Sequence, residues 1–132
     1  MSQAQVANNE GITETVLLMV GTAADELYNI CCIKTACSAA TASGYSSYTQ
    51  SAAAGLTEVS ADTVTASSSA FANDTWCIAH PFTAGATEAV LGFIAANSSG
   101  DALYGVCCFA GVVNMEISDT LTCTMKGTLS NT

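Results

Sequence analysis

The sequence predicts an all-β protein: an antiparallel, jelly-roll-like β-sandwich of about seven or eight strands, with a flexible N-terminal arm and one short helix. Near the C-terminus, Leu121, Cys123 and Met125 alternate with threonines, which is the period-two pattern of a strand with one buried face. After Gly55, segments rich in β-branched and aromatic residues recur at roughly 8–12-residue spacing. Turns containing Gly, Asn and Asp separate these segments, as expected for antiparallel strands joined by short connections.

The N-terminal region is predicted to be an arm followed by a helix. Residues 1–11 are rich in Gln, Asn and Ala and show no apolar periodicity, so we expect a flexible arm there and a single sandwich domain over residues 12–132. Apolar residues then recur at helical spacing: Ile12, Val16, Met19 and Val20. With Thr13 as the N-cap and Gly21 as the terminator, this spacing favours a short helix. The run Val16–Val20 also suits a strand, which stays the alternative.

The remaining chain is predicted to hold one long loop and seven strands. Tyr28–Thr35 is a compact apolar run and is expected to be a strand. Residues 36–54 contain almost no large aliphatic side chain, which predicts a surface loop that carries contacts. The other predicted strands are Leu56–Ala61, Thr63–Ser68, Thr75–Phe82, Glu88–Ala96, Ala102–Val113 and Thr120–Ser130. Pro81 lies near the end of its strand, which favours a strand edge or a bulge.

Composition excludes several classes of function. Half of the residues are apolar, only 10% are charged, and the chain carries two Lys, no Arg and eleven acids, for a net charge of −9. A chain so poor in cations is not expected to bind nucleic acid. The longest strongly apolar run is far too short to span a bilayer, and the N-terminus does not resemble a secretory signal, so we expect a protein made in the cytosol that does not enter a membrane. Because so few residues are charged, we expect part of the protein surface to be buried in an assembly.

Seven cysteines are expected to be reduced and packed in the core. No two of them have the two-residue spacing of a zinc knuckle, so no metal site is predicted. Adjacent cysteines on a strand point to opposite faces, so only one of each doublet could reach a common centre. A disulfide is the alternative, and Cys31 or Cys32 opposite Cys107 or Cys108 is the pair that it would join.

The sequence shows no catalytic apparatus. His80, the single histidine, lies in an apolar strand, where a histidine satisfied by the backbone is the simplest interpretation. The neighbouring carboxylates Asp25 and Glu26 lie in a loop, and no glycine-rich phosphate-binding loop is present. We therefore predict a protein that is not an enzyme and has no cofactor. Tyr45 and Tyr48 lie in the polar loop and are predicted to be exposed interface residues.

The C-terminal half resembles a family of virion proteins. The similarity lies in the following segments: Gly55–Val59, Asn73–Thr75, Glu88–Val106, Phe109–Gly111, Ser118–Leu121 and Thr124–Ser130. In order, they form an aromatic-containing hairpin with an Asn-Ser-Ser-Gly-Asp turn, a further aromatic strand, a Ser-Asp-Thr-Leu turn and a threonine-alternating final strand. This pattern is similar to that of small β-sandwich virion proteins of tailed phages and related viruses, of the capsid decoration or cement type. The resemblance covers residues 55–130, with a weaker match over residues 12–36.

The resemblance implies a structural virion protein that binds the outer surface of an icosahedral phage capsid and stabilises it. Its partners would be the major capsid protein and further copies of itself, as a homotrimer at a symmetry axis. The N-terminal arm and the loop of residues 36–54 would reach neighbouring subunits, and many small interfaces would add through multivalency. The alternatives are a phage tail or fibre protein and a carbohydrate-binding β-sandwich module, the latter favoured if Trp76 were exposed beside Asp74 and His80.

Overall fold

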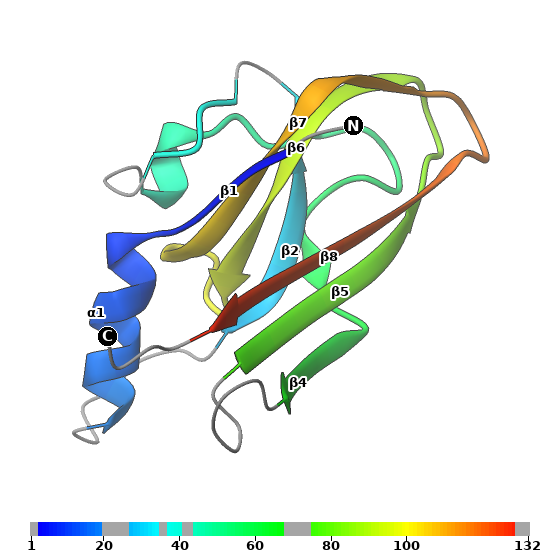
Figure 1. The fold of residues 1–132 in the computed structure, drawn as a ribbon. Helices are drawn as coiled ribbons and strands as arrows, with labels where there is room; N and C mark the ends of the chain where they lie inside the picture. The colour runs from blue at the N-terminus through cyan, green and yellow to red at the C-terminus, as the bar shows by residue number, and fades with distance from the viewer. Residues whose placement is uncertain (1–2, 20–26, 35–36, 41–43, 68–74, 129–132) are drawn as a thin grey trace.

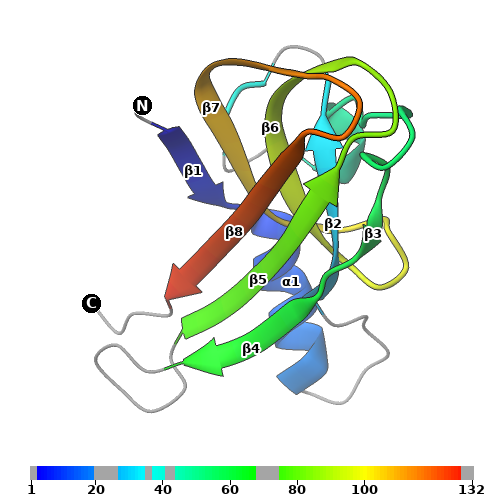
Figure 2. The ribbon, with the colours of Figure 1, turned by 90° about the vertical axis from the view of Figure 1, so that its right-hand side faces the viewer.

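The structure is a computed structural model that describes residues 3–19, 27–34, 37–40, 44–67 and 75–128. Its elements are β1 (Gln3–Ala7), α1 (Asn9–Met19), β2 (Leu27–Ile33), the 3-10 turn η1 (Tyr45–Ser47), β3 (Val59–Ser60), β4 (Thr63–Ser67), β5 (Thr75–Thr83), β6 (Glu88–Asn97), β7 (Leu103–Met115) and β8 (Thr120–Thr128). The large sheet has the strand order β1-β7-β6-β2-β3 and the small sheet the order β4-β5-β8 (Figures 1 and 2). All pairings are antiparallel, so the predicted all-β sandwich is confirmed.

The jelly-roll-like character comes from one long hairpin that folds over between the sheets. β6 pairs with β7 in the large sheet, and β5, which precedes β6, pairs with β8, which follows β7, in the small sheet. The two connections between the sheets are hydrogen-bonded to each other, because Ala84 N donates to Asp119 O at 2.9 Å and Ser118 N donates to Ala84 O at 2.7 Å. Ser118 adopts a positive φ of 77°, which lets this corner turn sharply.

A core of large apolar side chains lies between the two sheets. Ile30 of β2 and Phe93 of β6 pack there against Ile78 and Phe82 of β5 and Met125 of β8. These residues lie at alternate positions of their strands, as the period-two pattern of the sequence requires. The alternation predicted for Leu121, Cys123 and Met125 is thus the contact between β8 and the large sheet.

A second apolar cluster lies on the other face of the large sheet. It contains Cys31, Ile33, Ile94, Leu103, Val106 and Cys108, with Tyr48 and other residues of the 37–54 region packed against them. β2 is therefore buried on both faces, which explains its continuous apolar run. The described residues 37–40 and 44–54 form no strand, as predicted, but they cover a sheet instead of presenting a free contact loop.

The predicted N-terminal arm is wrong for the residues that the structure describes. Gln3–Ala7 forms the edge strand β1, which pairs with β7 from Gln3↔Phe109 to Ala7↔Gly105. The helix begins at Asn9, so the expected domain start at residue 12 falls inside α1. Alternation of small polar and apolar residues over five positions was too weak a signal to show this strand, because the pairing with β7 supplies what the local sequence lacks.

The helix itself is confirmed, with different ends. Ile12 N donates to Asn8 O at 3.3 Å, so the first turn starts at Asn8. Thr13, the predicted cap, lies inside α1 and its hydroxyl donates to Asn9 O at 3.2 Å. Gly21, the predicted terminator, lies outside the described residues. Glu10 occupies the first turn, where a carboxylate is favoured by the helix dipole.

The strand predictions hold with small shifts, except at residues 56–61. Only Val59–Ser60 of that segment forms a strand, since Leu56 is buried in a turn closed by its own amide to Ala53 O. Pro81 lies in β5 opposite Thr122 of β8. On the other side of β5, the pairing with β4 ends at Thr63↔Ala79. Pro81 is therefore at a half-open edge, as its missing N–H requires.

Candidate functional site

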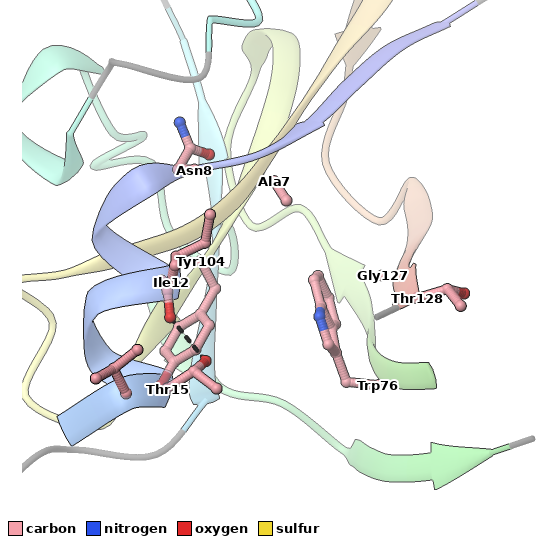
Figure 3. Close-up of a pocket in the computed structure, with 10 residues that line it drawn as sticks. Ala7, Asn8, Ile12, Thr15, Trp76, Tyr104, Gly127 and Thr128 are labelled. Carbon is pink, nitrogen blue, oxygen red and sulfur yellow. Dashed lines mark hydrogen bonds between the residues drawn. The ribbon is translucent and has the colours of Figure 1, made fainter. Parts of the chain in front are cut away.

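A small hollow opens between α1, the end of β1 and the ends of β5 and β8 (Figure 3). Its volume is about 160 Å³. The residues that line it are Ala7, Asn8, Gly11, Ile12, Thr15, Val16, Trp76, Tyr104, Gly127 and Thr128. Its walls are the indole of Trp76, the phenol ring of Tyr104 and the aliphatic side chains of α1, so the hollow is mainly apolar.

Glycines allow the two aromatic rings to form these walls. Trp76 lies directly opposite Gly127 in the β5–β8 register, and a Cβ on Gly127 would be 2.3 Å from indole ring atoms. Gly105 faces the far edge of the same ring. A Cβ on Gly11 of α1 would be 2.7 Å from the Cα of Tyr104. The rings are thus held against bare backbone, which fixes the shape of the hollow.

Several polar groups around the hollow have hydrogen-bond partners within the protein. The Thr15 hydroxyl donates to Gly11 O at 2.8 Å, and the Asn8 side-chain amide donates to Ala40 O at 2.9 Å. The hydroxyls of Thr128 and Thr75 are hydrogen-bonded to each other at 2.8 Å. A molecule that enters the hollow therefore meets hydrocarbon and aromatic surface.

A polar cluster on the other side of α1 joins the helix to the covering loop. Glu10 Oε2 accepts from Tyr45 N at 3.0 Å and from Leu103 N at 2.7 Å. The Tyr45 hydroxyl donates to Glu58 Oε2, and the Asn29 amide donates to Glu58 Oε1 at 3.0 Å. Burial, together with the hydrogen bond to Glu58, raises the pKa of Tyr45 to about 12. These groups hydrogen-bond to one another, so the cluster holds the covering loop in place.

The predicted exposure of Tyr45 and Tyr48 is therefore wrong. Tyr48 is only 8% exposed, packs in the outer apolar cluster and donates its hydroxyl to Ser38 O at 2.6 Å. Tyr45 is half-buried and bonded to Glu58. The polar composition of the loop suggested a solvated segment, but the outer face of the large sheet needs a cover and these two rings supply it.

The small sheet consists of β4, β5 and β8, which lie side by side (Figure 2), and the side chains of its outer face are nearly all uncharged. Its side chains come from alternate positions of the three strands: Thr63, Thr65, Thr75, Cys77, Ala79, Pro81, Thr83, Thr120, Thr122, Thr124, Lys126 and Thr128. The members on β8 are all exposed. Among these described residues Lys126 is the single formal charge. We refer to this set as the threonine face.

The cysteine prediction is wrong at two positions. Cys37 and Cys108 form a disulfide, with a Cα–Cα distance of 5.6 Å and a sequence separation of 71. Cys108 was among the candidates, but its partner lies in the loop and not on β2. The other five cysteines are free, and four of these are buried as predicted. Among the residues that the structure describes, no group of His, Cys, Asp and Glu is arranged to hold a metal ion.

Three of the cysteines outside the disulfide lie close together between the sheets, namely Cys32, Cys107 and Cys123. A hydrogen bond with Cys32, and then burial, raise the pKa of Cys123, and burial raises that of Cys107. On the opposite face of β2, burial raises the pKa of Cys31 to about 12. Thiols with raised pKa values stay protonated at neutral pH and are weak nucleophiles, so the structure favours their packing role.

His80 lies near the rim of the small sheet and not in the hollow. Its Nδ1 is 2.9 Å from Asp62 Oδ1, and its ring packs edge-on against Phe82 with a centroid distance of 4.6 Å. Asp62 is exposed, so this is a surface pair. Trp76 is half-buried and lies four positions from His80 along β5, while Asp74 lies outside the described residues. The sugar-binding alternative required an exposed Trp76, whereas Trp76 is half-buried in the wall of the hollow.

Sequence reasoning assigned Trp76 to the strand Thr75–Phe82 and did not identify the hollow. The signal that could have found it is the pairing of the chain's one tryptophan with a glycine on the neighbouring strand. That pairing depends on the register between β5 and β8, which cannot be read from the sequence. Tyr104 was assigned to a strand, but the irregularity between Ala95 and Ala96 that turns it toward α1 has no local signal.

No known relative supplies further information about this site. No protein-family model, no curated protein and no solved structure matches the chain. Within the described part of the chain, no helix has both the length and the apolar character needed to cross a bilayer.

Proposed function

We propose that this chain is a structural virion protein, a capsid decoration or cement protein that binds the outer surface of an icosahedral phage capsid and stabilises it. The observation that carries the proposal is the threonine face, a sheet surface of mainly small side chains on which Lys126 is the single charge. Charged residues are depleted from the centres of protein interfaces because desolvating them is costly. A stiff sheet of small neutral side chains suits contact with another regular protein surface.

The geometry of this face supports repeated shallow contacts. Neighbouring strands of a sheet are about 4.8 Å apart, and residues on one face of a strand repeat at roughly 6.7 Å. Rows such as Thr63–Ala79–Thr124 therefore form a regular array of methyl and hydroxyl groups. Each contact of this kind is weak, and association as a homotrimer on a symmetric shell would add them through multivalency.

The test is whether the purified chain cosediments with assembled capsids that lack it, at a fixed stoichiometry to the shell protein. In the proposed complex Thr124→Glu buries an added carboxylate midway along β8, on the threonine face, and we expect at least a roughly 10-fold loss of affinity. Thr87→Glu is the matched control, because Thr87 is also exposed but lies in the turn between β5 and β6. Equal binding by both variants, or no binding by the wild type, would exclude this face as the anchor.

Deletion of residues 1–11 would not be a clean test of an anchoring arm. Without β1 the edge of β7 loses its partner strand, and Tyr104 O loses the hydrogen bond that it accepts from Asn8 N. A loss of capsid binding after this deletion would therefore mix unfolding with loss of contact. The substitutions on the threonine face avoid this ambiguity.

The alternatives of a tail or fibre protein and of a carbohydrate-binding module remain open to the same experiments. A tail or fibre protein would use the threonine face equally well, and its location in fractionated particles would distinguish it. The specific observation that favours a binding module is the half-buried Trp76 in the wall of the hollow. Tryptophan faces are frequent partners of apolar and sugar ligands.

A further inference from the structure

The hollow beside Trp76 has the features of a small-molecule site, independently of any role in a virion. Its volume of about 160 Å³ is close to that of an apolar cavity of roughly 150 Å³ that stays dry and binds benzene. Two rings and the backbone of Gly11 and Gly127 form rigid walls. Because no side chain has to move to create it, the site is formed before any ligand arrives.

The hollow also has an entrance. Ile12 and Val16 of α1 line it and are 60% and 53% exposed, respectively. They lie one helical turn apart, so they form an apolar lip at the surface. A ligand can thus enter from solvent without unfolding, and part of this exposed surface would be covered when it does.

The chemistry of the lining selects an uncharged apolar ligand. None of the described residues that form the hollow carries a carboxylate, an ammonium group or an imidazole. The hydroxyls of Thr15 and Thr128 are hydrogen-bonded within the protein, and the side-chain NH2 group of Asn8 donates to Ala40 O. A charged or strongly polar ligand would lose its hydration without gaining partners. An aromatic ring can instead pack against Trp76 and Tyr104, with the preference of ring pairs for edge and offset contacts.

We propose that the hollow is a binding site for a single uncharged aromatic ring, of the size of toluene. Trp76 and Tyr104 supply the aromatic contacts, and Val16 and Ile12 close the mouth. A ligand of this size in a preformed apolar site is expected to bind with a Kd on the order of 1 mM or tighter. Methylcyclohexane, which has the same number of heavy atoms but no π-system, is expected to bind roughly 2- to 10-fold more weakly.

Trp76 is the single tryptophan of the chain, so its fluorescence reports on the hollow alone. We would titrate the full chain with toluene and then with methylcyclohexane, and follow the intensity and wavelength of this emission. A saturable change with toluene, and a weaker affinity for methylcyclohexane, is the expected result. A change that never saturates up to the solubility limit, or no change, would overturn the proposal.

Two exposed valines provide a matched pair of variants. Val16→Asp puts a carboxylate at the mouth of the hollow and is expected to weaken toluene binding at least about 10-fold, because the ring would contact an anion. Val112→Asp makes the same change at a valine of β7 that is 48% exposed and outside the hollow, and it should leave binding unchanged. Both positions are exposed, so neither variant should unfold the protein. Equal affinities of the two variants would refute the assignment of the site.

Discussion

Removing the Cys37–Cys108 disulfide is expected to cost this protein a large part of its stability. The bond links the covering loop to β7, on the face of the large sheet where Tyr48 and Ile33 are buried. It closes a loop of roughly 70 residues that contains η1, β3, β4, β5, β6 and the first part of β7. The perturbation is the double substitution Cys37→Ala with Cys108→Ala, which removes both sulfurs and leaves no new unpaired thiol at either position.

The expected magnitude follows from the length of that loop. In the chain-entropy description, a cross-link closing about 70 residues stabilises the folded state by roughly 4 kcal/mol at 25 °C. For a domain of this size, each kcal/mol corresponds to about 3–4 °C in Tm, so the double variant should melt roughly 15 °C lower. Since the loop also covers apolar surface, its loosening would add to this loss.

The assay is calorimetric unfolding with and without a reducing agent. Wild type should lose stability when reduced, whereas the double variant should be insensitive to reduction. Cys77→Ala is the control, because Cys77 is a free, half-buried cysteine on the threonine face.

Trypsin gives a local readout, since Lys34 and Lys126 are the two tryptic sites of the chain and Lys34 N donates to Thr49 O of the covering loop. Cleavage at Lys34 should accelerate in the double variant. Unfolding temperatures within about 3 °C of each other under oxidising conditions would refute the reasoning.

Three further predictions concern single residues. Gly127→Ala should destabilise the protein by about 1–3 kcal/mol and shift the tryptophan emission, because the new Cβ would overlap the indole. The control is Gly111→Ala, where a Cβ meets nothing within 4 Å, and chemical denaturation should show it to be neutral or slightly stabilising. Glu10→Gln should cost about 1 kcal/mol by weakening two charge-assisted hydrogen bonds, whereas Glu116→Gln at an exposed turn should have no effect. The raised pKa of Cys31 means that the folded state holds this thiol proton more tightly than the unfolded state. The protonated Cys31 thiol therefore contributes to the stability of the folded state below pH 9.0, and this contribution is lost as the pH rises towards about 12. We expect Cys31→Ala to make the free energy of unfolding vary less with pH over that range.

The fold was predictable because most of its strands are encoded by local pattern. The period-two alternation of β8 and the Asn97–Asp101 turn between β6 and β7 need no tertiary information to be recognised. β1 was not predictable in this way, because its five residues gain their strand structure from β7. The same holds for the 37–54 region, whose small polar residues give no sign of the apolar cluster beneath them.

The site depended on register, which the sequence specifies only through the assembled sheets. Shifting β8 by one residue against β5 would place a side chain opposite Trp76 and close the hollow. Likewise, the disulfide partner of Cys108 depends on how the covering loop crosses the sheet, and cysteine spacing carries no information about that path.

The two proposed surfaces lie on opposite faces of the small sheet and share only Thr128, so they can be tested against each other. Thr124 points outward on the threonine face, whereas Trp76 lies on the inward-facing side of β5 and faces the hollow. Thr124→Glu should abolish capsid binding and leave toluene affinity unchanged, and Val16→Asp should do the reverse. If Val16→Asp also released the chain from capsids, the lip of the hollow would be part of the capsid contact, and its natural occupant would be an apolar side chain of the shell protein. Separate effects would instead mean that a particle-bound copy keeps a free small-molecule site, because a partner seated on the outer face leaves the mouth between Ile12 and Val16 open.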